Sequence, residues 1–269
     1  MSPFIHRRLF ALQGREEDYG SVDIPPEELA GRLAGMLETV RGLNVTIPHK
    51  QAVIPCLRRL EGRAALYRSV NTIAVTPEGA VGYNTDADGF LCALKGAGVA
   101  LRGRAALLGC GGVGRTFACE AALAGCAVVN AVRDADREAA AALKEYVLAL
   151  SPKTDYAIVS LDNLAAQGDF DLLINATPVG MYPHADASPV EGEAVKRCAA
   201  VFDAVYNPRR TRLLELAEAA GARTVGGMPM LVWQAAAAHT VWYGASFREE
   251  DIQALTADAQ DEMERRFRR

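Results

Sequence analysis

The sequence lacks the signals of several protein classes. None of its apolar runs approaches the roughly 18 residues that a membrane-spanning helix needs, and the first residues, MSPFIHRRLF, lack the long apolar stretch of a secretory signal. Basic residues are not in excess, because 29 Lys and Arg face 33 Asp and Glu and give a net charge of −4. Binders of nucleic acid or anionic membranes need a basic field, so we expect neither partner, although a local basic pocket for a small anion is compatible with this charge.

The cysteines form no CxxC pair and no metal-like array with histidine. Six are scattered along the chain: Cys56, Cys92, Cys110, Cys119, Cys126 and Cys198. We therefore expect reduced thiols in a cytoplasmic protein and no metal site. The chain has 269 residues, 50% of them hydrophobic, which excludes global disorder and predicts one large or two small domains.

Apolar periodicity divides the chain into two regions that meet at a helix near residues 85–103. The first region predicts helices over 25–40, 52–60 and 86–94, and short strands over 43–47, 70–75 and 81–83. After Arg104, strands over 105–108, 126–132, 156–159, 171–175 and 200–205 alternate with helices, and the chain is helical after Met230. This alternation predicts an α/β fold whose parallel sheet is covered by helices on both faces.

A glycine-rich loop opens the second region. Gly109, Gly111 and Gly114 have G-x-G-x-x-G spacing, between a predicted strand and a predicted helix. The first glycine allows a tight turn, the second lets the backbone approach a pyrophosphate, and the third lets helix and strand pack closely. The helix N-terminus adds unpaired N–H groups and a positive dipole end. The loop therefore predicts dinucleotide binding.

The end of the next predicted strand bears on the choice of cofactor. An acidic residue there holds the ribose hydroxyls of NAD, whereas arginine accommodates the 2′-phosphate of NADP. Arg133 and Arg137 are close enough in sequence to share one phosphate, and Asp134 and Asp136 favour the opposite choice. The arginines favour NADP, and NAD stays an alternative.

Hydride transfer also requires a group that handles a proton, and Lys50 and Asp86 are the pair we predict. Both follow short apolar strands, within the polar clusters NVTIPHK and NTD. Oxidising an alcohol releases a proton, which a lysine can carry while a carboxylate orients it or shares its charge. Taken alone, Lys50 is more typical of a solvated surface lysine, and Asp86 of a helix N-cap. His49 is predicted to be a structural or solvent-facing neighbour rather than a base.

Together these segments resemble the shikimate dehydrogenase family. The matching segments, in the order of the family, are SPFIH (2–6), NVTIPHK (44–50), VNT (70–72), GYNTDADG (82–89), GCGGVG (109–114), INATPVGM (174–181), DAVYNPRRTRLL (203–214) and GGMPMLVWQAAAAHTVWYG (226–244). The resemblance implies reversible, NADP-linked reduction of 3-dehydroshikimate to shikimate in aromatic amino-acid biosynthesis. It also implies two lobes: a substrate-binding α/β domain of residues 1–86 and 230–269, and a Rossmann-like, doubly wound dinucleotide domain of residues 87–229. The protein is expected to be a monomer or homodimer.

The resemblance also implies a role for individual residues. Lys50 matches the catalytic lysine of the family and Asp86 the aspartate paired with it. The residues that match substrate-binding positions are Ser2, Thr46, Asn71, Tyr206 and Gln234. The residues that match cofactor-binding positions are Gly109, Gly111, Gly112, Gly114, Arg133, Arg137, Thr177, Met181 and Gly227. Hydroxyl donors such as that of Ser2 suit a carboxylate, because such hydrogen bonds are charge-assisted.

Three departures from the family leave alternatives open. Family members carry a strand and a first substrate serine before the SP element, whereas Met1 directly precedes Ser2 here. We expect either that Met1 is internal to the true protein or that the chain is an impaired paralogue, and that Ser2 is disordered. Asp134 replaces a family threonine and could repel a 2′-phosphate or bind a ribose hydroxyl. Arg7 replaces a family asparagine, a change expected to be local.

These departures define the alternative functions. A quinate or dual quinate/shikimate dehydrogenase, using NAD, would differ in pocket size near Thr46, Asn71 and Tyr206. A non-catalytic ligand sensor would share the fold, but a sensor does not need the proton-transfer groups Lys50 and Asp86, which are both present.

Overall fold

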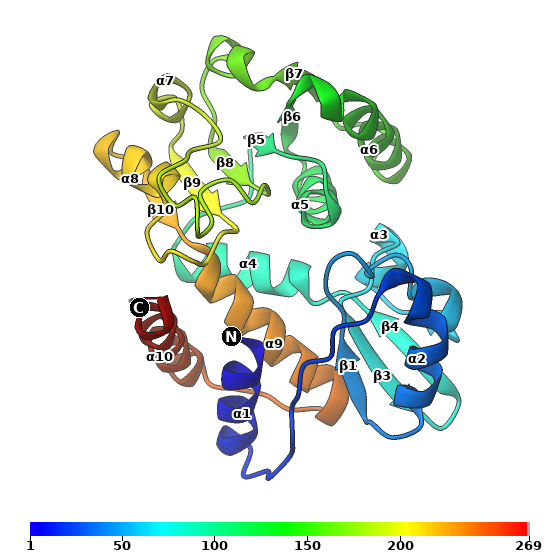
Figure 1. Cartoon of the computed structure of the whole chain (residues 1–269). Helices are drawn as coiled ribbons and strands as arrows, with labels where there is room; N and C mark the ends of the chain where they lie inside the picture. The colour runs from blue at the N-terminus through cyan, green and yellow to red at the C-terminus, as the bar shows by residue number, and fades with distance from the viewer. Residues whose placement is uncertain (268–269) are drawn as a thin grey trace. The chain divides into compact units, whose positions relative to one another are not determined.

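The computed structural model describes residues 1–267, which form two compact units (Figure 1). Unit 1 comprises Met1–Gly89 and Val232–Asp261, and unit 2 comprises Phe90–Leu231 and the end of the chain from Glu262. The chain therefore passes between the units within helices rather than through loops. No helix within residues 1–267 is both long enough and apolar enough to cross a membrane.

Unit 1 is built around a four-stranded sheet of order β1-β3-β4-β2. Its strands are β1 (Gly42–Asn44), β2 (Arg59–Leu60), β3 (Thr72–Thr76) and β4 (Gly79–Tyr83). Its helices are α1 (Ser2–Leu12), α2 (Leu29–Leu37), α3 (Arg63–Tyr67) and most of α9 (Gly227–Tyr243) and α10 (Glu249–Phe267). The chain leaves β4 into α4 (Asp86–Gly96).

Both faces of this sheet are covered by helices. β3 and β4 form an antiparallel hairpin in which Thr72 pairs with Tyr83, and Gly79 turns the chain at a φ of 122°. Ile73 packs on one face with Leu29 and Leu33 of α2, whereas Ala74 packs on the other with Ala238 and Trp242 of α9 (Figure 1). Alternate residues of one strand thus serve two cores, as the pleat of a strand requires.

Two expectations for this region are wrong. Ser2 is not disordered, because it is the first residue of α1. Pro3 suits the first helical turn, and the amides of Phe4 and Ile5 donate to the Met1 carbonyl at 2.9 and 3.1 Å. Burial of Ile5 and Leu9 holds this helix in place. The predicted helix over 52–60 is instead one 3-10 turn, Ile54–Cys56, followed by β2. Pro55 explains the difference, since proline inside a helix loses a hydrogen bond and clashes with the preceding turn.

Unit 2 contains a six-stranded parallel sheet of order β10-β9-β8-β5-β6-β7. Its strands are β5 (Arg104–Leu108), β6 (Ala127–Val132), β7 (Tyr156–Ser160), β8 (Leu172–Asn175), β9 (Ala200–Asp203) and β10 (Arg223–Val225). Its helices are α5 (Gly112–Leu123), α6 (Arg137–Leu150), α7 (Gly192–Val195) and α8 (Arg212–Ala219). Read from β7, the strands follow the doubly wound Rossmann order 3-2-1-4-5-6, whose direction reverses between β5 and β8. The predicted α/β class is confirmed.

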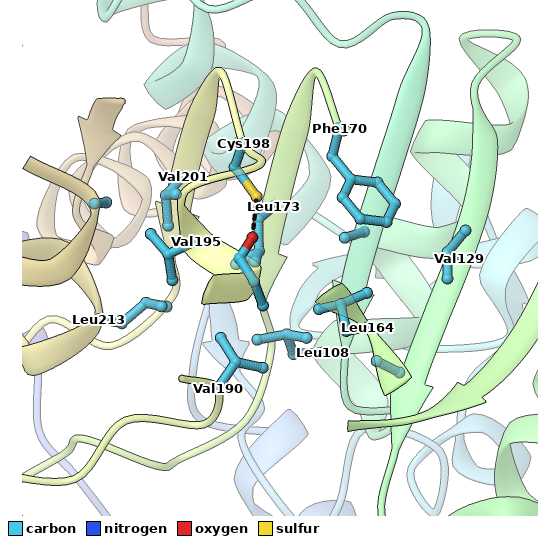
Figure 2. Close-up of a cluster of buried hydrophobic side chains, with 14 of the residues drawn as sticks. Leu108, Val129, Leu164, Phe170, Leu173, Val190, Val195, Cys198, Val201 and Leu213 are labelled. Atoms are coloured by element: carbon cyan, nitrogen blue, oxygen red, sulfur yellow. Dashed lines mark hydrogen bonds between the residues drawn. The ribbon is translucent and has the colours of Figure 1, made fainter. Parts of the chain in front are cut away.

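The core of unit 2 lies on both faces of that sheet. Figure 2 shows Leu108, Leu173 and Val201 of three neighbouring strands pointing toward residues of the segments before β9 and of α8, among them Val195 and Leu213. The next residue of β9, Phe202, points the opposite way, into rings of Phe90 from α4 and Phe117 from α5 at 4.9 and 5.5 Å. Strands buried on both faces position the loops at their carboxyl ends rigidly.

Candidate active site

Lys50 and Asp86 form a nearly buried ion pair in unit 1. Lys50 Nζ lies 2.6 Å from Asp86 Oδ2, and their side chains are 13% and 10% exposed. Asp86 is the first residue of α4, and its own amide donates to Asn84 Oδ1 at 3.1 Å. Asn84 therefore serves the start of the helix, which leaves the Asp86 carboxylate for Lys50.

Asn71 fixes the second oxygen of that carboxylate. The Thr85 amide donates to Asn71 Oδ1 at 2.7 Å, so the Asn71 amide group must present Nδ2 on its other side. Nδ2 contacts Asp86 Oδ1 at 2.9 Å and Gln234 Oε1 of α9 at 3.3 Å. The residue before β3, the start of α4 and α9 are thus tied into one hydrogen-bonded network around the lysine.

The structure brings four predicted site residues of unit 1 together and leaves two outside this network. Lys50, Asp86, Asn71 and Gln234 are joined by the contacts above, whereas Ser2 is half-buried at the start of α1 and Thr46 is exposed after β1. His49 Nε2 contacts the Ile24 carbonyl oxygen at 2.7 Å, which anchors a preceding loop and agrees with a structural role.

The glycine loop has the predicted context, between β5 and α5. Gly109 has a φ of 94°, and a Cβ there would lie 2.9 Å from Thr177 Cγ2. A Cβ on Gly114 would lie 3.1 Å from the Gly109 carbonyl oxygen, so this glycine permits the close approach of helix and strand. Gly111 and Gly112 instead face open space, and the N-cap residue of α5 is Gly111, which has no side chain with which to cap the first turn. Their exposed backbone is therefore accessible to a phosphate group.

The loops after β8 and β9 hold the remaining predicted residues of unit 2. Thr177 follows β8 and bonds back to Asn175, and Met181 lies exposed beyond it. Tyr206 is 37% exposed in the loop after β9. Gly227 starts α9 and its amide donates to the Val205 carbonyl at 3.2 Å. Because β5 and β8 flank the reversal of strand order, the glycine loop and the Thr177 loop lie at the position where such sheets bind ligands.

Arg133 and Arg137 lie beyond the end of β6, as predicted, but each is engaged by a neighbouring carboxylate. Arg133 Nε lies 2.7 Å from Asp136 Oδ2, and Arg137 Nε lies 2.9 Å from Asp134 Oδ1. Both guanidinium groups are mostly exposed, at 73% and 52%. Hydrogen bonding to Asp136 raises the pKa of Arg133 further above its usual range.

Three buried polar groups were not predicted as site residues. Thr85 orients Asn71; Asp203 and Asn175 bond to each other in unit 2; and His6 and His239 contact each other at 2.9 Å in unit 1. The Asp203–Asn175 pair could have been identified from the sequence, because Asp203 is a charged residue at the end of an apolar strand. In residues 1–267 no three His, Cys, Asp or Glu side chains gather as a metal site.

The residues of unit 2 fit a dinucleotide phosphate. A helix N-terminus with uncapped amides suits a pyrophosphate, and Gly111 and Gly112 leave open the space that a side chain would fill. The Nη groups of the two exposed arginines suit a 2′-phosphate. The fit to a dinucleotide phosphate therefore depends on the backbone amides at the start of α5 and on the arginines after β6, and not on the glycine spacing alone.

Comparisons with known proteins give a consistent assignment. Residues 1–73 match a family described as the shikimate dehydrogenase substrate binding domain. The chain is 37% identical over 247 residues to the shikimate dehydrogenase (NADP(+)) of Moorella thermoacetica, covering 91% of this chain and 84% of the relative. It is 40% identical over 252 residues to that of Methanopyrus kandleri, covering 91% and 86%.

A solved structure agrees with the sequence comparisons. The shikimate 5-dehydrogenase of Thermus thermophilus, in complex with NADP(H) and shikimate, superposes with a TM-score of 0.84 at 35% identity, covering 96% of this chain and 94% of that one. The names of these relatives do not favour the quinate, NAD or sensor alternatives. With this identity over most of both chains, the protein belongs to the shikimate dehydrogenase family.

Proposed function

We propose that this protein catalyses the NADP-dependent, reversible reduction of 3-dehydroshikimate to shikimate, a step in aromatic amino-acid biosynthesis. The observation that carries the proposal is the Lys50–Asp86 pair at 2.6 Å, held by Asn71, in a chain whose relatives are named for this reaction. Substrate hydroxyls are assigned to Thr46, Asn71 and Gln234, and the substrate carboxylate to Ser2. Tyr206 is assigned to the lining of the substrate pocket.

The proposed chemistry separates a hydride from a proton. The chemistry that NADP would supply when bound is hydride transfer at the alcohol carbon of shikimate, in either direction. Lys50 Nζ holds the proton at the reacting oxygen: it donates it when the ketone is reduced and accepts it when the alcohol is oxidised. The Asp86 carboxylate balances the charge of Lys50 Nζ through Oδ2. It also keeps Nζ in place, because Asn71 binds the other carboxylate oxygen, Oδ1, and so fixes the carboxylate.

The cofactor is assigned to unit 2. Gly109, Gly111, Gly112 and Gly114 would hold the pyrophosphate, and Arg133 and Arg137 would bind the 2′-phosphate. Thr177, Met181 and Gly227 would contact the ribose and nicotinamide. We also infer a reducing compartment such as the cytoplasm, since all six cysteines are free thiols.

The test crosses shikimate and quinate against NADP⁺ and NAD⁺ and follows the absorbance of reduced cofactor. We expect turnover with shikimate and NADP⁺ above the other three pairs. Lys50→Ala should lower kcat by about 10²- to 10⁴-fold while calorimetry still detects shikimate binding, and Lys95→Ala, at an exposed lysine, is the control. A wild-type protein that turns over no pair contradicts the function, and a Lys50→Ala variant with normal turnover contradicts the mechanism.

A further inference from the structure

Asp203 carries a buried carboxylate that the proposed chemistry does not use. It is the last residue of β9 and is fully buried. Its Oδ1 accepts hydrogen bonds from Asn175 Nδ2 at 2.9 Å and from the Val205 amide at 3.0 Å, and its Oδ2 accepts one from Thr211 Oγ1 at 2.6 Å. One side chain therefore binds the end of β8, the loop after β9 and the start of α8.

The first of these bonds leads to the glycine loop. Asn175 donates to Asp203 through Nδ2 and accepts through Oδ1 from both the Thr177 amide and the Thr177 hydroxyl, at 3.0 and 2.7 Å. The Thr177 methyl group in turn packs close to Gly109, where it would lie 2.9 Å from an added Cβ. The position of Thr177 thus depends on which way the Asn175 amide faces, and Asp203 determines that orientation.

The second bond leads to the loop after β9. Asp203 holds the Val205 amide, and Val205 in turn accepts the Gly227 amide at the start of α9. A Cβ on Gly227 would collide with the Ala204 carbonyl oxygen, so the start of α9 packs directly against the backbone of the loop after β9. Tyr206 follows Val205 directly. Three residues are assigned to ligand binding: Thr177, Tyr206 and Gly227. Each is connected to the Asp203 carboxylate through one intervening residue, by hydrogen bonds or by the chain itself.

Only a carboxylate serves all three donors at once. The donors come from different elements and need two acceptor oxygens, which an asparagine or a serine lacks. Burial raises the pKa of Asp203, and the bonds from Thr211, Val205 and Asn175 oppose that rise. Within residues 1–267 no Lys or Arg forms an ion pair with it, so the hydrogen bonds alone hold the group.

We infer that Asp203 is a positioning residue for the cofactor: its carboxylate fixes the loops after β8 and β9 so that Thr177 and Gly227 meet the nicotinamide half of NADP while Tyr206 is held beside them. This inference rests on the proposed function. It separates two parts of the cofactor site, since the arginines that would bind the 2′-phosphate follow β6 and are not linked to Asp203 by these bonds.

Calorimetry with two ligands tests this inference. One is NADP⁺, and the other is adenosine 2′,5′-bisphosphate, which lacks the nicotinamide half. Asp203→Ala should weaken NADP⁺ binding on the order of 10- to 100-fold, since three buried donors lose their acceptor, and change binding of the bisphosphate by less than about threefold. The control is Asp171→Ala, which removes an exposed carboxylate that accepts the Arg104 amide at the opposite end of β8 and should leave both affinities unchanged.

Two further variants keep the test decisive if Asp203→Ala does not fold. Asp203→Asn keeps the size and the one acceptor oxygen that can serve Asn175 and the Val205 amide, but it loses the acceptor for the Thr211 hydroxyl, so it should weaken NADP⁺ binding less than Asp203→Ala does. Thr211→Val removes the bond to Oδ2 with little change of volume and should weaken NADP⁺ selectively but less. Equal loss for both ligands, or unchanged NADP⁺ binding in the folded variants, overturns the inference. A wild-type protein that binds neither ligand overturns the proposed function and this inference with it.

Discussion

In unit 1 the predicted catalytic pair lies inside a hydrogen-bonded network, whereas in unit 2 the predicted phosphate-binding arginines lie in solvent. Lys50 and Asp86 are held by Asn71, which the Thr85 amide orients. Within residues 1–267, the ion-pair partners of Arg133 and Arg137 are carboxylates three residues away along the chain. Exposed pairs of this kind are weak and screened by salt. Proton transfer needs a geometry fixed before substrate arrives, while a phosphate can reorganise flexible arginines on binding.

The largest effect should come from breaking the buried pair without removing Lys50. Asp86→Asn keeps the shape but loses the charge that holds Nζ, and we expect kcat for shikimate oxidation to fall by about 10²- to 10³-fold. Steady-state rates across pH 6–10 measure this change. The matched control is Asp88→Asn on the same helix, which removes an exposed partner of Arg63. Equal losses in the two variants would mean that any carboxylate at the start of α4 has the same role.

The second effect concerns the stability of unit 1 in acid. Burial lowers the pKa of His6 to about 3, with His239 adding to it, and burial lowers the pKa of His239 to about 4, with Arg15 adding to it. Both imidazoles are neutral in the folded protein. Above pH 6.5 they are neutral in the unfolded chain too, so they do not lower the free energy of unfolding there. As the pH falls from 6.5 toward about 3 and 4, only the unfolded chain binds protons at these residues, and the folded state loses stability. Each imidazole should lower the free energy of unfolding by up to about 1.4 kcal/mol per pH unit below 6.5.

Urea denaturation at pH 7.0, 6.0 and 5.0 measures this slope. His239→Gln should flatten it, because the contact of 2.9 Å with His6 is broken and one titrating group is gone. His184→Gln, at an exposed histidine, should leave the slope as in the wild type. A slope that His239→Gln does not change would assign the acid sensitivity to other groups. The exposed arginine pairs of unit 2 are not expected to add a comparable dependence of the free energy of unfolding on pH.

Local patterns predicted most of the fold, and their errors have local causes. The glycine loop and its flanking strand and helix are a short-range signal, and the structure confirms them as β5 and α5. The helix over 52–60 was predicted from periodicity alone, which does not weigh Pro55 against the apolar spacing. Ser2 was expected to be disordered because terminal residues usually are, but burial of Ile5 and Leu9 orders it, and burial depends on partners elsewhere in the chain.

The candidate site was predicted in its residue types but not in its connections. Lys50 and Asp86 could be paired from chemistry and resemblance, and the structure places them in contact. The supporting bonds could not be predicted, because they join residues distant in sequence: Asn71 with Gln234, or Asp203 with Asn175. Which strand ends meet is a property of sheet order, and no periodicity within one strand contains it.

The third effect is on cofactor choice. Arg133→Ala should raise the KM for NADP⁺ about tenfold or more, since a charge-assisted bond to the 2′-phosphate is lost, and should leave the KM for NAD⁺ unchanged. Initial rates with each cofactor at saturating shikimate measure the ratio. Arg212→Ala, at an exposed arginine of α8 that pairs with Glu215, is the control. A parallel rise for both cofactors would assign Arg133 to a role unrelated to the 2′-phosphate.

The smallest effect should run in the opposite direction and tests how the carboxylates act. Asp136→Asn removes the charge that faces Arg133 at 2.7 Å, and we expect NADP⁺ to bind a few-fold more tightly at low salt. Two consequences of Asp136 compete here: its charge repels a phosphate, and its hydrogen bond orients the guanidinium. In water the orienting bond is worth little, whereas repulsion of a doubly charged group acts over the Debye length of about 10 Å at 0.1 M salt.

Calorimetric titration of NADP⁺ at 20 and 300 mM salt separates these two consequences. If repulsion dominates, the gain of Asp136→Asn shrinks at high salt, and Asp134→Asn, which frees Arg137, behaves in the same way. If orientation dominates, Asp136→Asn weakens binding at both salt concentrations, and the arginines of unit 2 are then prearranged as Lys50 is in unit 1. That outcome would remove the difference between the units: both sites would have their charged groups fixed before a ligand arrives.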